Sequence, residues 1–246
     1  MQPAAPDIDL EKVSFSFPGT VLFREMDFHI RAGGWTCLLG PSGCGKSTLL
    51  RLISGSLRRG VSGSIRFDGT PRGRGQTAWM AQKDLLLPWL SVLDNVLLGD
   101  RLRGGVTPER RQKARDLLQA VGLGHCAGDL PDRLSGGMRQ RAALLRTLME
   151  ERPVILMDEP FSALDAITRT RLQDLAAGML RGATVVLVTH DPLEALRLGH
   201  RIHVMSGSPV KMGPALQPPG DPPRQVDDPV VAGMHAELLG RLTGAA

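Results

Sequence analysis

The sequence Gly-Pro-Ser-Gly-Cys-Gly-Lys-Ser-Thr at 40–48 constrains the fold of this chain more than any other feature. It follows the apolar run at 35–39, which is typical of a buried strand, and leads into a predicted helix at about 46–57. Glycines let successive backbone N–H groups curve around an anion, and the helix N-terminus adds its positive end. The pattern predicts a phosphate-binding loop between strand and helix, with a plain glycine-rich turn as the alternative.

In a loop of this kind, the lysine reaches the β and γ phosphates of a nucleotide and the following hydroxyl ligates Mg²⁺. Lys46 and Ser47 occupy these two places. The candidate phosphate-contacting residues are therefore Gly40, Pro41, Ser42, Gly43, Cys44, Gly45, Lys46, Ser47 and Thr48.

Two carboxylates follow a second apolar run, at 154–157. A carboxylate at the end of a buried parallel strand beside a phosphate loop is placed to complete a magnesium site, and we assign this role to Asp158. Glu159 is one residue further on and is free to act as a base on attacking water. An ordinary strand end that meets solvent is the alternative.

The pattern of apolar residues predicts an α/β fold. The first thirty residues alternate apolar and polar side chains, which indicates an antiparallel sheet at the N-terminus. The runs at 154–157 and 184–188 are apolar throughout, with a helix-like stretch at 168–180 between them. Strand, helix and strand in this order, with both strands buried, indicate a parallel sheet.

From about Gln82 to Glu151 the pattern becomes helical, and we interpret this stretch as an all-helical insertion. Thr107 is a predicted N-cap, with Pro108 at the first helical position. After a proline-rich segment, a short helix is predicted at about 230–242, and we interpret 213–246 as a tail.

A second loop suited to anions lies at 134–140, with the sequence Leu-Ser-Gly-Gly-Met-Arg-Gln, before a predicted helix at 138–151. Ser135, Gly136 and Gly137 offer a hydroxyl and unobstructed N–H groups at a helix N-terminus. A simple N-cap is the alternative, because one nucleotide does not need two such loops in one chain.

Composition excludes several classes of protein. The net charge is only +5 and Tyr is absent, which argues against a dedicated nucleic-acid binder. The most apolar stretch, at 85–98, contains Pro88 and Asp94 and is too short to span a membrane. The first residues lack the pattern of a secretory signal, so we expect a cytoplasmic chain that starts near Met1. The three cysteines show neither paired metal-ligand spacing nor a disulfide framework.

Taken together, these motifs resemble the nucleotide-binding subunit of ABC transporters over about residues 8–212. The matching segments are, in order, the phosphate loop, Gln82, Leu134–Met138, Asp158-Glu159, Ser162–Asp165 and His190. The resemblance implies a P-loop NTPase (ABC ATPase) core with a parallel sheet, an N-terminal antiparallel β subdomain and an inserted helical subdomain at about 83–151.

The resemblance also implies a head-to-tail homodimer that holds two ATP molecules with Mg²⁺, each between the phosphate loop of one copy and Ser135–Gly137 of the other. It makes Glu159 the general base, and it gives His190 a contact with the γ-phosphate. Gln82 would link magnesium and water to a membrane subunit, and Asp165 would contact the opposite copy. Phe17 would stack on adenine, with a core strand position as the alternative. Met138 departs from the more common Gln.

The family places its groove for the membrane subunit at the apolar segment 85–90; the interior of the helical insertion is the alternative. The implied partners are permease subunits and, indirectly, a periplasmic binding protein, with this chain on the cytoplasmic face of the inner membrane. Segments 85–96 and 158–169 resemble importers for nitrate, sulfonate, taurine and thiamine pyrimidine precursors, and 188–207 is most similar to the last of these. A soluble ABC ATPase of DNA repair, translation or cluster assembly, and a regulatory module with little hydrolysis, are the rival functions.

Overall fold

The structure is a computed structural model that describes residues 5–71, 75–225 and 227–244. Contacts between residues divide the chain into two compact units. The first unit consists of Met1–Thr77, Arg152–Glu159 and Leu180–Ala246, and the second of Ala78–Glu151 and Pro160–Met179. The second unit thus contains the stretch for which the sequence predicts a helical subdomain, together with one further helical segment.

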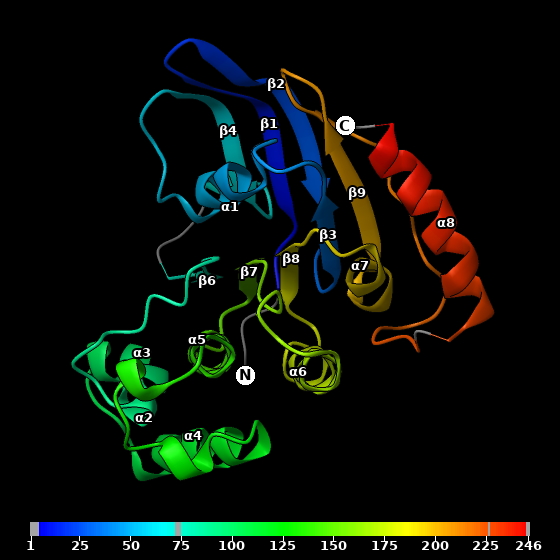
Figure 1. Cartoon of the computed structure of the whole chain (residues 1–246). Coiled ribbons are helices and arrows are strands. Elements are labelled where there is room, and N and C mark those ends of the chain that lie inside the picture. The colour runs from blue at the N-terminus through cyan, green and yellow to red at the C-terminus, as the bar shows by residue number, and fades with distance from the viewer. Residues whose placement is uncertain (1–4, 72–74, 226, 245–246) are drawn as a thin grey trace. The chain divides into compact units, whose positions relative to one another are not determined.

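An antiparallel sheet forms one part of the first unit (Figure 1). Its strand order is β2-β1-β4-β5, with β1 at Ile8–Phe17, β2 at Thr20–Ile30, β4 at Val61–Phe67 and β5 at Thr70–Pro71. Ile8, Leu10, Val13 and Phe15 of β1 are buried. The alternation of apolar residues therefore predicted this sheet correctly.

A second sheet of the first unit has the strand order β10-β9-β3-β8-β7. These strands are β3 (Trp35–Leu39), β7 (Val154–Asp158), β8 (Thr184–Val188), β9 (Arg201–Ser206) and β10 (Lys211–Met212). β3 is parallel to β8 and β9, and β7 is parallel to β8. Every residue of β3, β7 and β8 is buried, as expected for parallel strands covered on both faces. Strand β6 (Thr77–Met80) runs across the boundary between the two units.

Helices of the first unit pack against this second sheet (Figure 1). Helix α1 (Lys46–Ser54) lies against β7 and β8, and its apolar residues share one core with both sheets. It ends three residues before the predicted end, because Gly55 takes a left-handed conformation that closes the helix. Helix α7 (Pro192–Leu198) packs against β3 and against α8 (Pro229–Thr243), the helix that the sequence predicts at the C-terminal end.

The second unit is helical, apart from the end of β6. It contains α2 (Val92–Val96), α3 (Leu98–Leu102), α4 (Pro108–Ala120), α5 (Gly136–Leu148), α6 (Ala166–Met179) and two short 3₁₀ turns at Gly124–Cys126 and Pro131–Arg133. Thr107 caps α4 as predicted, since its side chain accepts a hydrogen bond from the N–H of Arg110. The predicted bounds of α5 were wrong by two to three residues, because Ser135 already caps the helix. Residues 82–91 are also not helical, in contrast to the prediction.

Candidate functional site

The predicted phosphate loop connects β3 to α1 in the first unit. Gly40, Gly43 and Gly45 have φ angles of 151°, 78° and 101°, a region that favours glycine. A Cβ atom on Gly40 would lie 2.5 Å from the carbonyl oxygen of Met205, and one on Gly45 would lie 3.0 Å from the methyl groups of Leu22. Glycine is therefore required at 40 on steric grounds as well as for backbone conformation, and at 45 it is favoured by the positive φ angle and by the close approach of Leu22.

Lys46 begins α1 and has only 8% of its surface exposed. Its ammonium group donates hydrogen bonds to the carbonyl oxygens of Gly40 at 2.7 Å and Pro41 at 2.8 Å, and the Sγ atom of Cys44 lies 3.9 Å away. Carbonyl oxygens carry only partial negative charges, so they do not neutralise the ammonium group of Lys46. They hold the positive charge in place within the loop. Such a loop is suited to a polyanionic phosphate chain.

Two of the three predicted magnesium ligands, Ser47 and Asp158, lie together. Asp158 ends β7 and is 4% exposed, and its carboxylate accepts a hydrogen bond from the hydroxyl of Ser47. The pKa of Asp158 is raised, chiefly by burial and also by Glu159, while Ser47 and the charge of Lys46 act in the opposite direction. A hydroxyl and a carboxylate are oxygen donors of the kind that Mg²⁺ prefers, so this pair fits the ion. Among the described residues, no group of three or more His, Cys, Asp and Glu forms a separate metal site.

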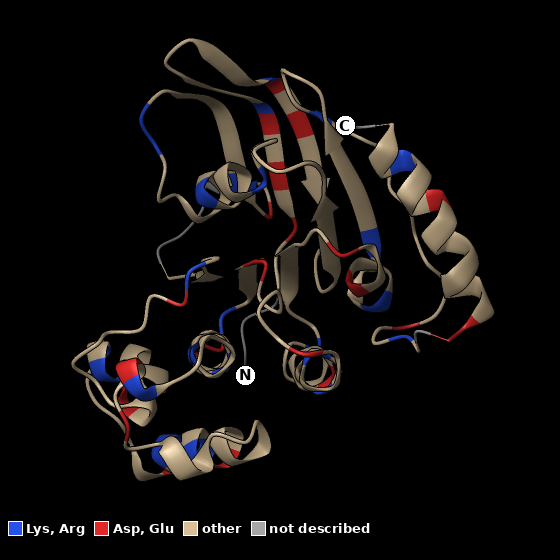
Figure 2. Cartoon of the chain, viewed as in Figure 1, with Lys and Arg blue, Asp and Glu red and all other residues tan. Residues whose placement is uncertain are grey.

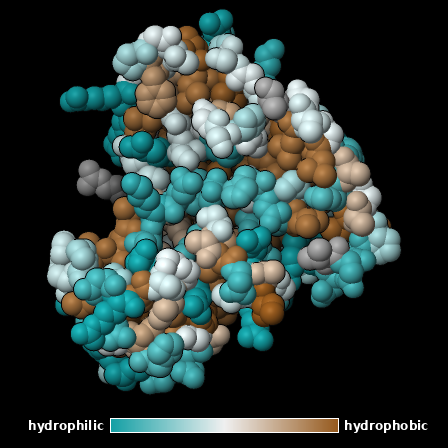
Figure 3. All heavy atoms as spheres, in the orientation of Figure 1, coloured by the Kyte–Doolittle hydropathy of each residue, from teal (hydrophilic) through white to brown (hydrophobic). Residues whose placement is uncertain are grey.

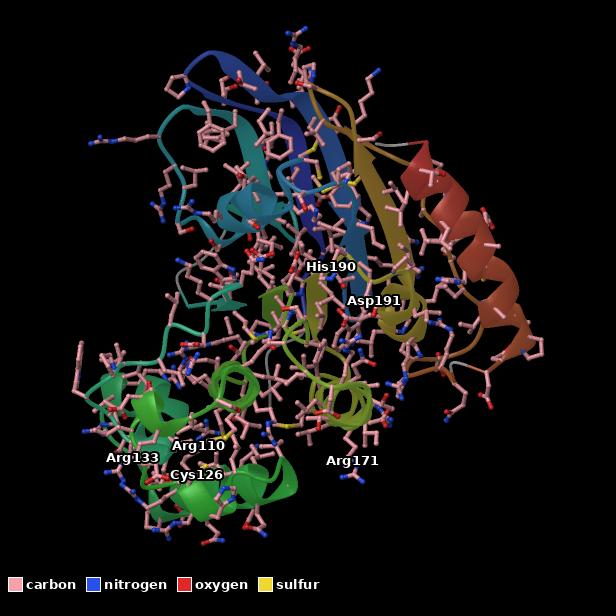
Figure 4. All side chains as sticks on the ribbon, viewed as in Figure 1. Arg110, Cys126, Arg133, Arg171, His190 and Asp191 are labelled. Atoms are coloured by element: carbon pink, nitrogen blue, oxygen red, sulfur yellow. The ribbon has the colours of Figure 1, made fainter. Side chains whose placement is uncertain are left out.

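The side chains of Glu159 and His190 lie close together, a contact that the sequence alone did not predict. The Nδ1 atom of His190 lies 3.3 Å from Oε2 of Glu159, and the two side chains are 64% and 19% exposed. Glu159 has a φ angle of 49°, and its N–H donates a hydrogen bond to the carbonyl of Val188 on the neighbouring strand. Figure 4 shows His190 and Asp191 where β8 leads into α7. The sequence could have predicted this contact, because β7 and β8 are parallel neighbours and the residues that follow them meet at one edge of the sheet.

The second predicted anion loop belongs to the second unit. The Oγ atom of Ser135 accepts a hydrogen bond from the N–H of Met138 at 3.3 Å, which makes Ser135 the N-cap of α5. A Cβ atom on Gly137 would lie 3.1 Å from the carbonyl oxygen of Ala163, so glycine also permits a close approach there. The loop thus leaves backbone N–H groups of Gly136 and Gly137 at a helix N-terminus.

Gln140 joins this loop to the segment that contains Asp165, and the sequence analysis gave Gln140 no role. Its Oε1 atom accepts a hydrogen bond from the N–H of Ala163 at 2.8 Å, and its Nε2 atom lies 3.3 Å from the hydroxyl of Ser162. Asp165 accepts a hydrogen bond from the N–H of Thr168 in the first turn of α6. Hydrogen bonds from the backbone and the side chain of Thr168 lower the pKa of Asp165. Hydrogen bonds of Gln140 therefore link the segments of two predicted dimer contacts, Ser135 and Asp165, within the second unit.

Phe17 and Gln82 are both exposed. Phe17 ends β1 with 48% of its surface accessible, and its ring packs edge to face on that of Phe15 at 5.0 Å between centroids. The alternative of a core position for Phe17 is therefore wrong. Gln82 lies in the loop that follows β6, in the second unit.

The apolar segment 85–90 is held by polar contacts but exposes its largest side chains. Trp89 is 71% exposed and Leu85 is 59% exposed, while Leu86 is buried. The amide of Asn95 donates to the carbonyls of residues 87, 90 and 91 and accepts from the N–H of residue 87. Arg146 donates to the carbonyls of residues 84 and 85. Interior packing thus accounts for Leu86 alone. Figure 3 shows hydrophobic side chains that reach the surface in several places.

Among the described residues, no helix combines the length and the apolar character that a membrane span requires.

Comparisons with known proteins agree with this arrangement. The family model described as ABC transporter matches residues 23–162. An ABC transporter ATP-binding protein of Haemophilus influenzae is 44% identical, over 96% of this chain and 99% of its own length. An aliphatic sulfonates import ATP-binding protein of Rhodococcus jostii is 40% identical over 97% of this chain and 94% of its own. A taurine import ATP-binding protein of Chromobacterium violaceum is 40% identical over 93% of each chain.

A solved structure is also similar. It is the dimer of an ATP-binding cassette in a post-hydrolysis state, bound to ADP and phosphate. The TM-score is 0.75 at 28% sequence identity, and the match covers 87% of this chain and 99% of the other. The predicted α/β fold of an ABC ATPase is thereby confirmed. With its phosphate loop, acidic strand end and Leu-Ser-Gly-Gly loop, the chain belongs to the ABC transporter family as an ATP-binding ATPase subunit.

Proposed function

We propose that this chain powers an importer of small organic sulfonates by hydrolysing ATP between two copies of itself. The observation that carries the proposal is the division of the two anion-binding loops. The loop at 40–48 lies in the first unit and the loop at 135–137 in the second, each preorganised by its own contacts. A head-to-tail pair of copies brings the two kinds of loop to each nucleotide.

The first unit supplies the groups for phosphoryl transfer to water. Lys46 and the N–H groups of residues 43–48 bind the β and γ phosphates, and Ser47 and Asp158 hold Mg²⁺. When bound, the ion neutralises charge on the phosphate oxygens. Glu159 then takes a proton from the attacking water.

His190 and Phe17 orient the substrate in this proposal. His190 and Glu159 lie 3.3 Å apart at the edge of the sheet, so His190 contacts the γ-phosphate while Glu159 faces the water. Phe17 presents an exposed ring on which the adenine stacks. Gln82 contributes an amide to magnesium and to the water.

The second copy completes the site. Its loop at 135–137 binds the γ-phosphate through backbone N–H groups, and its Asp165 contacts the opposite copy. The dimeric cassette structure that resembles this chain supports this arrangement. The proposal also gives a reason for Gln140, which ties the two contact segments together so that they move as one.

The exposed segment 85–90 is the proposed docking surface for a permease subunit. Trp89 and Leu85 present apolar area on a backbone that Asn95 and Arg146 hold in place, which lowers the entropic cost of binding. A chain docked in this way is peripheral, on the cytoplasmic face of the inner membrane. It meets a periplasmic binding protein only indirectly, through the permease.

Growth on defined sulfur sources tests the importer function. Deletion of the gene should abolish growth on an alkanesulfonate or taurine as the sole sulfur source and leave growth on sulfate unchanged. The wild-type gene should restore growth, and the Glu159→Gln variant should not. A growth defect that only the pyrimidine precursor of thiamine corrects would assign the solute to that branch of the family. Normal uptake of all these solutes by the deletion strain would contradict an import role and favour a soluble ABC ATPase.

The docking surface has its own test. Trp89→Asp should lower transport at least about tenfold and leave the ATPase activity of the isolated chain unchanged, because a charge opposes burial of the surface. Leu102→Asp is a matched control, since Leu102 is an equally exposed apolar residue in the same unit. Equal losses of transport in both variants would contradict a specific role for segment 85–90.

A further inference from the structure

The second unit contains a pocket of about 510 Å³ that the proposed ATPase function does not use. It lies between the end of α4, Arg141 of α5 and the stretch 168–175 of α6. Its polar lining comprises Arg141, Arg171, Gln119 and Thr168, and its apolar wall includes Leu172 and Leu175. Its volume is within the range of about 300–1,000 Å³ that is typical of sites for small organic molecules.

The charge of this lining is one-sided. Two guanidinium groups line the pocket, and no Asp or Glu is among its lining residues. Arg171 projects from α6 (Figure 4) and is exposed, and within the described part of the chain it forms no ion pair or hydrogen bond. Helices α4 and α6 carry both basic and acidic residues, whereas α5 carries only basic ones (Figure 2), and the acidic residues of α4 and α6 do not line the pocket.

Other arginines of the same unit have carboxylate partners. Arg110 pairs with Asp100 and Glu151, and Arg139 pairs with Asp84. Arg141 instead donates through Nη1 to the carbonyl of Val121 at 2.7 Å and through Nε to that of Gly137 at 3.3 Å. Carbonyl groups orient the Arg141 cation without neutralising it.

We propose that this pocket binds a small organic anion with a short apolar tail. The acidic head, a sulfonate, carboxylate or phosphate, lies between the guanidinium groups of Arg141 and Arg171, which bind such groups through charge-assisted hydrogen bonds. Gln119 and Thr168 add neutral donors, and the tail packs on Leu172 and Leu175. A purely inorganic anion leaves this apolar wall unused.

A ligand in the pocket affects the loop at 135–137 through Arg141, which contacts both. The Nε atom of Arg141 is bonded to the carbonyl of Gly137, in the first turn of α5. A head group that draws the guanidinium into the pocket changes this contact, so the ligand alters hydrolysis as well as binding to the chain. This regulatory consequence rests on the proposed function, whereas binding itself does not.

Calorimetric titration of the nucleotide-free chain with 1-hexanesulfonate tests the proposal. Arg171→Gln should weaken binding at least about tenfold, because one charged hydrogen-bonding partner is lost. Arg115→Gln should bind the probe as the wild type does, since Arg115 is an exposed arginine on α4 that does not line the pocket. Leu175→Glu should also prevent binding, by placing a carboxylate beside the arginines.

Variation of the probe separates head from tail. Methanesulfonate should bind more weakly, by up to about fourfold for each methylene group removed, and hexyltrimethylammonium should not bind. Hexanoate and hexyl phosphate show which acidic head the pocket prefers. Equal binding of the cationic and anionic probes would overturn the assignment.

The phosphate loop is a second site at which the anionic probe could bind. The Lys46→Ala variant distinguishes binding at this loop from binding in the pocket. The proposal expects this variant to bind hexanesulfonate normally and expects saturating ATP not to compete with the probe. Binding that is lost in Lys46→Ala but kept in Arg171→Gln would place the probe at the phosphate loop and overturn the proposal. The absence of any binding at millimolar hexanesulfonate would do the same. None of these outcomes depends on whether the chain hydrolyses ATP.

Discussion

At the scale of single residues, the charge on Lys46 is positioned before any nucleotide arrives. Two carbonyl oxygens of its own loop accept its hydrogen bonds, and its side chain is almost fully buried. Preorganisation of this kind means that little reorientation is needed when phosphate oxygens replace the carbonyls.

Lys46→Ala should therefore lower ATP hydrolysis at least about a hundredfold, because the cation that neutralises the phosphates is gone. Lys211→Ala is the control, since Lys211 is an exposed lysine of the same unit. A phosphate-release assay measures both. Retention of half the activity by Lys46→Ala would rule out the assigned role.

Cys44 is the most accessible thiol of the three. Cys37 and Cys126 are buried, and burial raises the pKa of both thiols, with further contributions from Glu194 and Asp129 respectively. Cys44 is partly exposed and lies inside the phosphate loop.

A maleimide should accordingly react first at Cys44 and inhibit hydrolysis, and ATP should slow both effects. Mass spectrometry of the peptides identifies the modified thiol, and Cys44→Ser should resist inactivation. Inactivation at an unchanged rate in the presence of ATP would show that Cys44 does not face the phosphates.

At the scale of elements, hydrogen bonds of Arg224 connect the proline-rich segment before α8 to the end of α7. This buried side chain donates through Nη1 to the carbonyls of Leu196 and Gly199, and through Nη2 to those of Pro218 and Gly220. A cation at a helix C-terminus also complements the helix dipole. Because α7 begins at Pro192, two residues after His190, these hydrogen bonds support the helix that follows the histidine.

Arg224→Ala should lower the free energy of unfolding by about 3 kcal/mol, because several buried carbonyls lose their donor. Urea denaturation followed by circular dichroism measures the loss. Arg181→Ala provides the comparison, as an exposed arginine of the same unit whose removal should change stability by less than about 0.5 kcal/mol. Indistinguishable unfolding curves for the two variants would contradict this role of Arg224.

Elements whose signals are local were predictable from the sequence. The alternation in β1, the fully apolar β7 and β8 and the Thr107 cap each depend on neighbouring residues alone, and the structure confirms them. The end of α5 and the irregular course of residues 82–91 were not predicted. The latter depends on Asn95 and Arg146, whose hydrogen bonds to the segment compete with helix formation.

Contacts between segments distant in sequence explain the rest. Residues of the site such as Asp158, Glu159 and His190 were identified from motifs, but their mutual geometry needed the register of β7 on β8. Arg224 gave no signal at all, since its partners are backbone carbonyls that any sequence provides. Arg141 and Arg171 likewise share a pocket only because α5 and α6 meet in three dimensions.

In the proposed dimer, two copies of the whole molecule complete each other's ATP sites. Each copy carries a phosphate loop in one unit and a Leu-Ser-Gly-Gly loop in the other, and in the proposed dimer each nucleotide lies between loops of different copies. Dimerisation should therefore depend on ATP that is bound but not hydrolysed.

Size exclusion with light scattering gives the molar mass of the Glu159→Gln variant in solution and tests whether ATP joins two copies. Without nucleotide the variant should elute at 26.5 kDa, and with ATP and Mg²⁺ at about twice that mass. Addition of Lys46→Ala to the same chain should abolish the shift. A Glu159→Gln chain that binds ATP and stays at 26.5 kDa would contradict the shared ATP site of the head-to-tail dimer.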